Sequence, residues 1–293
     1  MATLRELKGR IGSVASSEKI TGAMKMISSA KMHKAEQMLR QLVPFRSQIE
    51  NIISNLLSAD ASFESPLLEA RDVKKIAVCV WGSDDGLCGA YNVNVYKRLI
   101  GHIFELRSQY GQNVEIEVVA IGSKIAKACN KLAMQNIAVI TYDNVNSKSD
   151  DESVRTFTYE MVDNFRQGVF DRVDLLYMNF KSVSRQIARI DRILPISQSM
   201  FDDVAAKASA RPYIFEPDVN TIFNRVLPLF ILSVMQEVFI ENRASEQAAR
   251  VMAMQSANDN AKKLLDSLQL EYNKLRQQSI TTELLDIVGG QIR

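Results

Sequence analysis

One glycine-rich loop has the residue types and the position of a phosphate-binding turn. The apolar run Ile76–Trp81 predicts a buried strand, and Gly82–Gly89 (Gly-Ser-Asp-Asp-Gly-Leu-Cys-Gly) follows it before a helical pattern begins. A glycine-rich turn that enters a helix can offer backbone N–H groups to a phosphate. This loop lacks the Gly-x-Gly-x-x-Gly spacing and the Gly-Lys-Ser/Thr of a P-loop, and Asp84 and Asp85 would repel a phosphate. We therefore interpret it as a structural turn and expect no cofactor.

Cys88, near the expected start of the next helix, is the one candidate nucleophile in this loop. A nucleophilic thiol needs a base, and the chain has only two histidines. His33 lies in an amino-terminal helical pattern and His102 in the middle of a later one, so neither is expected beside Cys88. A packed, inert thiol is the favoured interpretation. The three cysteines show no Cys-x-x-Cys spacing and no metal-ligand cluster appears, so neither a disulfide framework nor a metal site is expected.

Composition and charge are those of an ordinary globular protein. The chain is 46% hydrophobic and 24% charged with a net charge of +2, which gives no strong case for nucleic-acid binding. The start, Met1–Arg10, has no apolar signal-peptide region, and the apolar run Val226–Met235 is too short to span a bilayer. Any membrane association is expected to come through partners.

The last quarter of the chain predicts an unusually long carboxyl-terminal helix. Leu229–Val288 contains no Gly or Pro, and as one helix its roughly 60 residues would form a rod of roughly 90 Å. Its charged residues exclude a membrane span and it shows no internal repeat, so a coiled coil remains. The expected seam is strong near the carboxyl end: Leu264, Leu268, Tyr272, Leu275, Ile280, Leu284 and Ile287. It weakens upstream: Ala244, Ala248, Val251, Gln255 and Asn258.

The amino-terminal segment predicts a second long helix, from residue 2 to about 57. Its seam starts with apolar residues spaced by three and four: Leu4, Leu7, Ile11 and Val14. Pro44 should kink or divide this helix, and Pro228 should separate a short helix, capped by Asp218, from the long carboxyl-terminal one. The segment Asn55–Arg71 resembles a linker.

The middle of the chain alternates strands with helices, which predicts an inserted, Rossmann-like α/β domain with a mostly parallel sheet. The expected strands are Ile76–Trp81, Glu115–Ile121, Ile137–Tyr142, Val173–Phe180 and Ile187–Ile196, the last two as a hairpin. The expected helices are Asn92–Tyr110, Ser123–Met134 and Glu152–Gln167, with Phe201–Arg211 as a loop. The two end helices should pair antiparallel as a coiled coil. The expected divisions are residues 1–57, 58–75, 76–210 and 211–293.

Three separated stretches together resemble the gamma subunits of F-type ATP synthases. The first runs from Arg10 to Lys31 and includes Lys19–Met26 (Lys-Ile-Thr-Gly-Ala-Met-Lys-Met); the second is Ser83–Asn92. The third begins at Ser245–Arg250 (Ser-Glu-Gln-Ala-Ala-Arg) and continues to Gly290. Their order and spacing over the whole length make the match specific. Asp85 stands where the family usually has Arg.

The resemblance implies a central-stalk rotor subunit that transmits torque and leaves catalysis to the β subunits. It also implies α, β, epsilon and c-ring subunits as partners and a peripheral place on the cytoplasmic face of the bacterial plasma membrane, reached through the c-ring. Carried over by motif, the expected contacts with β are Met24, Lys25, Arg250, Arg276, Gln277 and Thr281. Ser83, Gly86 and Gly89 would shape the turn of the α/β domain.

Two alternatives remain open from the residues alone. A coiled-coil tether that carries an α/β binding module would self-associate without α and β chains. An α/β enzyme whose Gly82–Gly89 loop binds phosphate would show saturable ligand binding.

Overall fold

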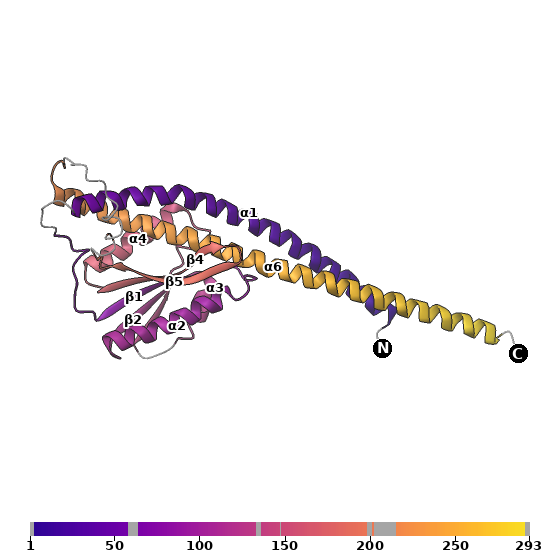
Figure 1. Cartoon of the computed structure of the whole chain (residues 1–293). Coiled ribbons are helices and arrows are strands. Elements are labelled where there is room, and N and C mark those ends of the chain that lie inside the picture. The colour runs from indigo at the N-terminus through magenta and orange to yellow at the C-terminus, as the bar shows by residue number, and fades with distance from the viewer. Residues whose placement is uncertain are drawn as a thin grey trace.

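The computed structural model describes residues 3–57, 64–132, 136–146, 148–197, 201 and 215–290. Two long helices lie side by side, and a five-stranded α/β domain packs against one part of their length (Figure 1). The helices are α1 (Leu4–Leu57, 54 residues) and α6 (Val219–Gly290, 72 residues). They run antiparallel, since Glu18 of α1 meets Asn258 of α6 while Arg46 meets Glu237. The helix, α/β, helix plan and the antiparallel coiled coil are confirmed.

The divisions expected at Pro44 and Pro228 were wrong, while the kink expected as the alternative at Pro44 stays a prediction. Pro44 lies inside α1 and Pro228 inside α6, and both helices continue through them. A helix-interior proline removes one hydrogen bond and crowds the preceding turn, a cost that surrounding packing can offset. Around Pro228 that packing is dense, because Leu227, Phe230 and Ile231 are buried. Asp218 does accept a hydrogen bond from the Thr221 N–H, at 2.8 Å, as a helix cap does.

The sheet has the strand order β3-β2-β1-β4-β5. Its strands are β1 (Lys75–Trp81), β2 (Glu115–Ile121), β3 (Ile137–Thr141), β4 (Arg172–Ser182) and β5 (Arg185–Leu194). The pairs β1–β2, β1–β4 and β2–β3 are parallel, and the hairpin β4–β5 is antiparallel. The intervening helices are α2 (Tyr91–Tyr110), α3 (Ser123–Cys129) and α4 (Asp151–Arg166). The mostly parallel sheet and the terminal hairpin are therefore confirmed, while the expected Phe201–Arg211 loop lies, except for Phe201, outside the described residues.

Each face of the sheet builds its own core. Side chains alternate along a strand, so Ile76, Val78 and Val80 of β1 pack with α2 and α3 on one face. Ala77, Cys79 and Trp81 point to the other face, where α4, α6 and the second half of α1 cover them. The helix α6 is consequently part of the domain core along its first half. The α/β domain thus lies alongside the helix pair and not at its tip.

Beyond the domain the seam residues of the coiled coil are less buried. Of the predicted carboxyl-terminal seam only Leu268 is buried, whereas Leu264, Ile280, Leu284 and Ile287 are between 46% and 62% exposed. Figure 1 shows the reason for the last of these residues, because α6 continues past the amino-terminal end of α1. The upstream seam, which has the weaker apolar pattern in the sequence, is the better buried: Ala244, Ala248, Val251 and Asn258.

A test of length and composition for membrane spans selects one helix, within Val219–Ile287. Its most apolar window has a mean hydropathy of 1.4, and 50% of that window is buried inside the protein. The core helix of a domain passes the same test, and the first half of α6 has that place here.

Candidate functional site

The structure divides the residues predicted from the sequence motifs into two groups. Met24 and Lys25 are half-buried on α1. Arg276, Gln277 and Thr281 lie exposed on the part of α6 beyond the domain, where the Thr281 hydroxyl donates to the Gln277 carbonyl at 2.9 Å. These five residues remain candidates for contact with another chain.

Arg250, the sixth predicted contact, has a different place. It is only 6% exposed, and its guanidinium donates to the backbone carbonyls of the glycine-rich loop. Nε and Nη2 each lie 3.2 Å from the Gly86 oxygen, and Nη2 lies 3.3 Å from the Asp85 oxygen. Nη2 also pairs with Glu246 at 2.7 Å, one helical turn away. Arg250 therefore binds its own chain's loop, and its contact with a β subunit stays a prediction.

The loop itself is held in one shape by its own side chains. Ser83 is buried; its N–H donates to Asn92 Oδ1 at 3.1 Å, and its hydroxyl donates to the Asp85 carbonyl at 2.9 Å. Gly89 has φ +61°, a left-handed conformation that glycine adopts without strain. Gly86 supplies the carbonyl that Arg250 binds. The loop's polar groups are thus used internally, which favours the structural turn over a phosphate site.

The contact between α6 and the sheet continues along one face of α6. Asn242 Nδ2 donates to the Gly82 carbonyl at 3.2 Å, and the Tyr91 hydroxyl donates to Asn242 Oδ1 at 2.6 Å. The Ser245 hydroxyl donates to the Met178 carbonyl at 2.7 Å. Asn179 Nδ2 donates to both carboxylate oxygens of Glu241, at 2.8 and 2.6 Å. We call this set the polar joint; its α6 members are Glu241, Asn242, Ser245, Glu246 and Arg250.

Burial sets the electrostatics of the joint. Desolvation raises the pKa of Glu246 above its ordinary value; Arg250 opposes this rise, and Asp84 and Asp85 add to it. Desolvation likewise raises the pKa of Glu241, although the hydrogen bond from Asn179 opposes this. Among the described residues the second carboxylate oxygen of Glu246 has no hydrogen-bond partner. A buried ion pair of this kind gives directional attachment at a desolvation cost.

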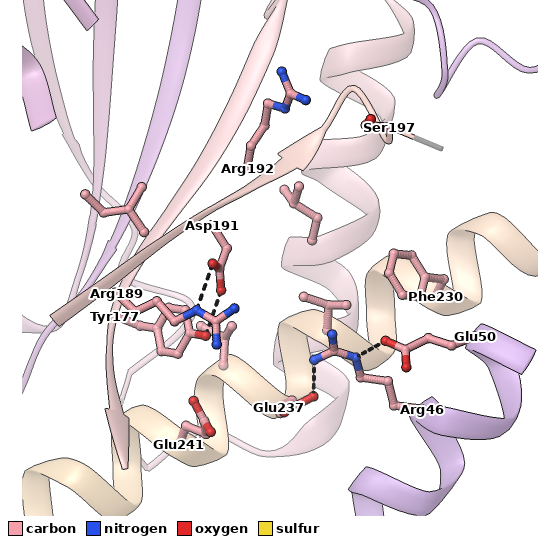
Figure 2. Close-up of a pocket in the computed structure, with 14 residues that line it drawn as sticks. Arg46, Glu50, Tyr177, Arg189, Asp191, Arg192, Ser197, Phe230, Glu237 and Glu241 are labelled. Carbon is pink, nitrogen blue, oxygen red and sulfur yellow. Dashed lines mark hydrogen bonds and ion pairs between the residues drawn. The ribbon is translucent and has the colours of Figure 1, made fainter. Parts of the chain in front are cut away.

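A second set of charges joins α1 to α6 beside β5 (Figure 2). Arg46 of α1 pairs with Glu50 at 2.8 Å and with Glu237 of α6. The two acids and the arginine line a cavity of about 530 Å³ whose opposite wall is β5. On that wall Arg189 Nε pairs with Asp191 at 2.9 Å. These acids and bases largely neutralise one another, so the cavity presents no concentrated charge for a ligand.

The candidate catalytic groups are not assembled. Cys88 is 3% exposed, with its sulfur 3.7 Å from the Ser83 hydroxyl. His102 instead contacts Asp174 at 2.7 Å, and His33 lies exposed on α1 beside Glu36. Within the described ranges, no group of three or more His, Cys, Asp or Glu residues could hold a metal ion. The geometry is that of a long helix anchored firmly in a domain.

Comparison with known proteins agrees with this arrangement. The family described as ATP synthase matches residues 3–291. A protein of Phocaeicola vulgatus named ATP synthase gamma chain is 38% identical over 292 residues, covering 100% of both chains. This chain belongs to the ATP synthase gamma-chain family. A gamma chain of Pasteurella multocida is 34% identical over 291 residues and covers 99% of each chain.

Two solved ATP synthase structures contain a chain whose fold is similar to that of this chain. A chain of the Euglena gracilis mitochondrial ATP synthase aligns with a TM-score of 0.60 at 20% identity, covering 99% of this chain and 93% of that one. A chain from the central stalk and c-ring of the Tetrahymena thermophila enzyme gives a TM-score of 0.56 at 20% identity, covering 81% and 99%. At this identity the likeness shows the shared fold.

The polar joint itself was missed by sequence reasoning, although Glu246 and Arg250, an oppositely charged pair four residues apart, were a usable signal.

Proposed function

We propose that this chain is the central-stalk rotor subunit of an F-type ATP synthase. On this proposal it transmits torque between the membrane c-ring and the ring of α and β subunits, and so couples proton translocation to ATP synthesis or hydrolysis. Family membership supports the assignment. The observation that carries the mechanism is the polar joint, which fixes the long α6 to the sheet through buried bonds.

The mechanical argument follows from the continuity of α6. One hydrogen-bonded helix of 72 residues extends from the domain core to the exposed carboxyl-terminal end. A rotation applied to the α/β domain must therefore turn α6, because its polar face cannot slip past the sheet without leaving buried groups unpaired. Met24, Lys25, Arg276, Gln277 and Thr281 are the proposed contacts with β subunits.

The finer parts of the proposal concern chemistry and place. We propose that the chain itself is not catalytic, that α, β, epsilon and c-ring subunits are its partners, and that it is a peripheral protein on the cytoplasmic face of the bacterial plasma membrane. Bacterial relatives support the location. The proposed divisions are a first shaft helix (1–57), a connection (58–75), an α/β domain (76–210) and a second shaft region (211–293).

The test is co-purification followed by a coupling assay. A tagged full-length chain should recover α and β chains in threefold excess, whereas a tether would recover only itself. In inverted membrane vesicles, ATP hydrolysis should drive proton pumping, and Arg276→Glu should lower pumping per ATP hydrolysed. Asp266→Asn, on the same helix, serves as the comparison variant. Recovery without α and β chains would refute the rotor assignment.

A further inference from the structure

One stretch of the coiled coil contains no fully buried apolar side chain. Residues 8–27 of α1 contain no buried side chain. On the facing part of α6, between Met254 and Leu268, the only buried side chain is Asn258. Leu7 at one end and Ser28 at the other bound this stretch of α1. Apolar side chains such as Ile11, Val14 and Leu265 are only half-buried there, so the apolar seam holds the two helices together less firmly than a closed seam would.

Asn258 makes a specific contact across this stretch. Its Nδ2 donates to the backbone carbonyl of Glu18 at 2.7 Å and lies 3.3 Å from the Thr21 hydroxyl. The carbonyl of a helical residue is normally overlain by the side chain four positions later, which points back toward the amino terminus. For Glu18 that position is Gly22, and the Glu18 carbonyl accepts from the Thr21 hydroxyl of its own helix at 3.0 Å as well as from Asn258. A Cβ built on Gly22 would lie 3.4 Å from Asn258 Nδ2.

We propose that Asn258 and Gly22 form a register key that positions the amino-terminal part of α1 on α6. A buried amide must keep its hydrogen bond, and in the observed register the Glu18 carbonyl accepts it. Gly22 leaves the space beside the amide open, whereas a side chain longer than a methyl group would have to share that space. The key is a positioning element and needs no partner chain.

The key also sets the direction of two proposed contact residues. Met24 and Lys25 lie within one helical turn of Gly22, so the setting of α1 at the key decides which way they face. This consequence rests on the proposed function, but the register key itself does not. Experiments on the free chain therefore test the key even if the rotor assignment fails.

The direct test measures the distance between spin labels on the two helices of the full-length chain. Cysteines replace the exposed Arg10 of α1 and Asn273 of α6, and the three native cysteines are buried. We expect one narrow distance in the parent. With Asn258→Leu we expect a broadened distribution, since the amino-terminal part of α1 would no longer be held at one position on α6.

The matched control is Gln255→Leu, on the same helix. Gln255 is half-buried, but its amide donates to Asp259 of its own helix at 2.9 Å, so the same change should keep the narrow distance. An unchanged narrow distance in Asn258→Leu would overturn the proposal. A broadening in both variants would also overturn it, because the effect would then belong to any added leucine.

Glycine substitutions give a second, independent measurement. Nothing lies within 4 Å of a Cβ built on Gly12, so Gly12→Ala should raise the melting temperature of the full chain by about 2 °C. Gly22→Ala gains the same helix propensity but brings its methyl group to 3.4 Å from Asn258 Nδ2, so we expect a smaller rise than for Gly12→Ala. An equal rise in melting temperature in both variants would show that the missing side chain at Gly22 plays no part in the register key.

Discussion

The two halves of α6 are held by different kinds of interaction. From Val219 to Met254 the helix lies in the domain core, and its polar side chains bond to residues more than sixty positions away in sequence. From Gln255 to Gly290 the described side chains, apart from that of Asn258, form their hydrogen bonds within the helix, as between Ser279 and Glu283. Isolated helices are only marginally stable in water. The near half is therefore complete in this chain, while the far half depends on a surface that other chains must supply.

The largest expected effect comes from removing the arginine of the joint. Arg250→Ala leaves Glu246 buried without its partner, and we expect a loss of about 3–5 kcal/mol in the free energy of unfolding. Urea denaturation of the full chain measures it. Arg276→Ala, an exposed arginine on the far half, should change stability by less than about 0.5 kcal/mol. Equal effects of the two variants would erase the contrast between the halves.

A pH series sharpens the role of Glu246. Because burial raises its pKa in the folded state, the folded protein holds the proton more tightly than the unfolded chain does. Its contribution to stability is then fully present below the ordinary value of 4.5 and is lost as the pH rises through the raised pKa. Glu246→Gln should remove this loss, which is about 1.4 kcal/mol for each tenfold difference in proton affinity between the two states. Parallel pH profiles for the two proteins between about pH 4 and 7 would contradict the expectation.

A smaller effect is expected from a single hydroxyl in the joint. Tyr91→Phe removes the donor to Asn242 while preserving the packed ring, and should cost about 1 kcal/mol in unfolding free energy. Tyr272→Phe, on the far half, should cost no more than a few tenths of a kcal/mol. If Tyr272→Phe proved the more costly, the far half would be better ordered in the free chain than its exposure indicates.

The smallest effect in the free chain is expected at the far end. Leu284 is 57% exposed, so Leu284→Ala should change the unfolding free energy by less than about 0.5 kcal/mol. In the assembled complex of the proposed function, the same variant should weaken recovery of α and β chains. A large loss of stability in the free chain would mean that Leu284 is already buried, for example by self-association.

The sequence predicted the elements better than their contacts. Glu115–Ile121 is a strand with the bounds expected, because its apolar residues and flanking turns are local signals. Pro44 lies inside a continuous helix although its neighbours Val43 and Phe45 are exposed. The interruption expected at Pro228 was wrong, since burial of neighbouring side chains outweighs a lost hydrogen bond there. Local signals do not contain that contribution from tertiary packing.

The candidate site shows the same limit more strongly. A family motif pointed to Arg250, but its partner Gly86 lies 164 positions away, and no spacing rule connects them. The seam was misjudged for a related reason. Leu284 and Ile287 fit a heptad pattern, yet α1 does not extend far enough to cover them. How far the two helices overlap depends on how they align with each other, and the sequence of one segment does not give that alignment.

The unequal overlap of the two helices has a consequence for biogenesis. In a newly made chain the apolar side chains between Ile280 and Ile287 are exposed, and such a surface favours aggregation and proteolysis. On the proposed function, synthesis of this chain together with its partner subunits would keep that apolar surface covered.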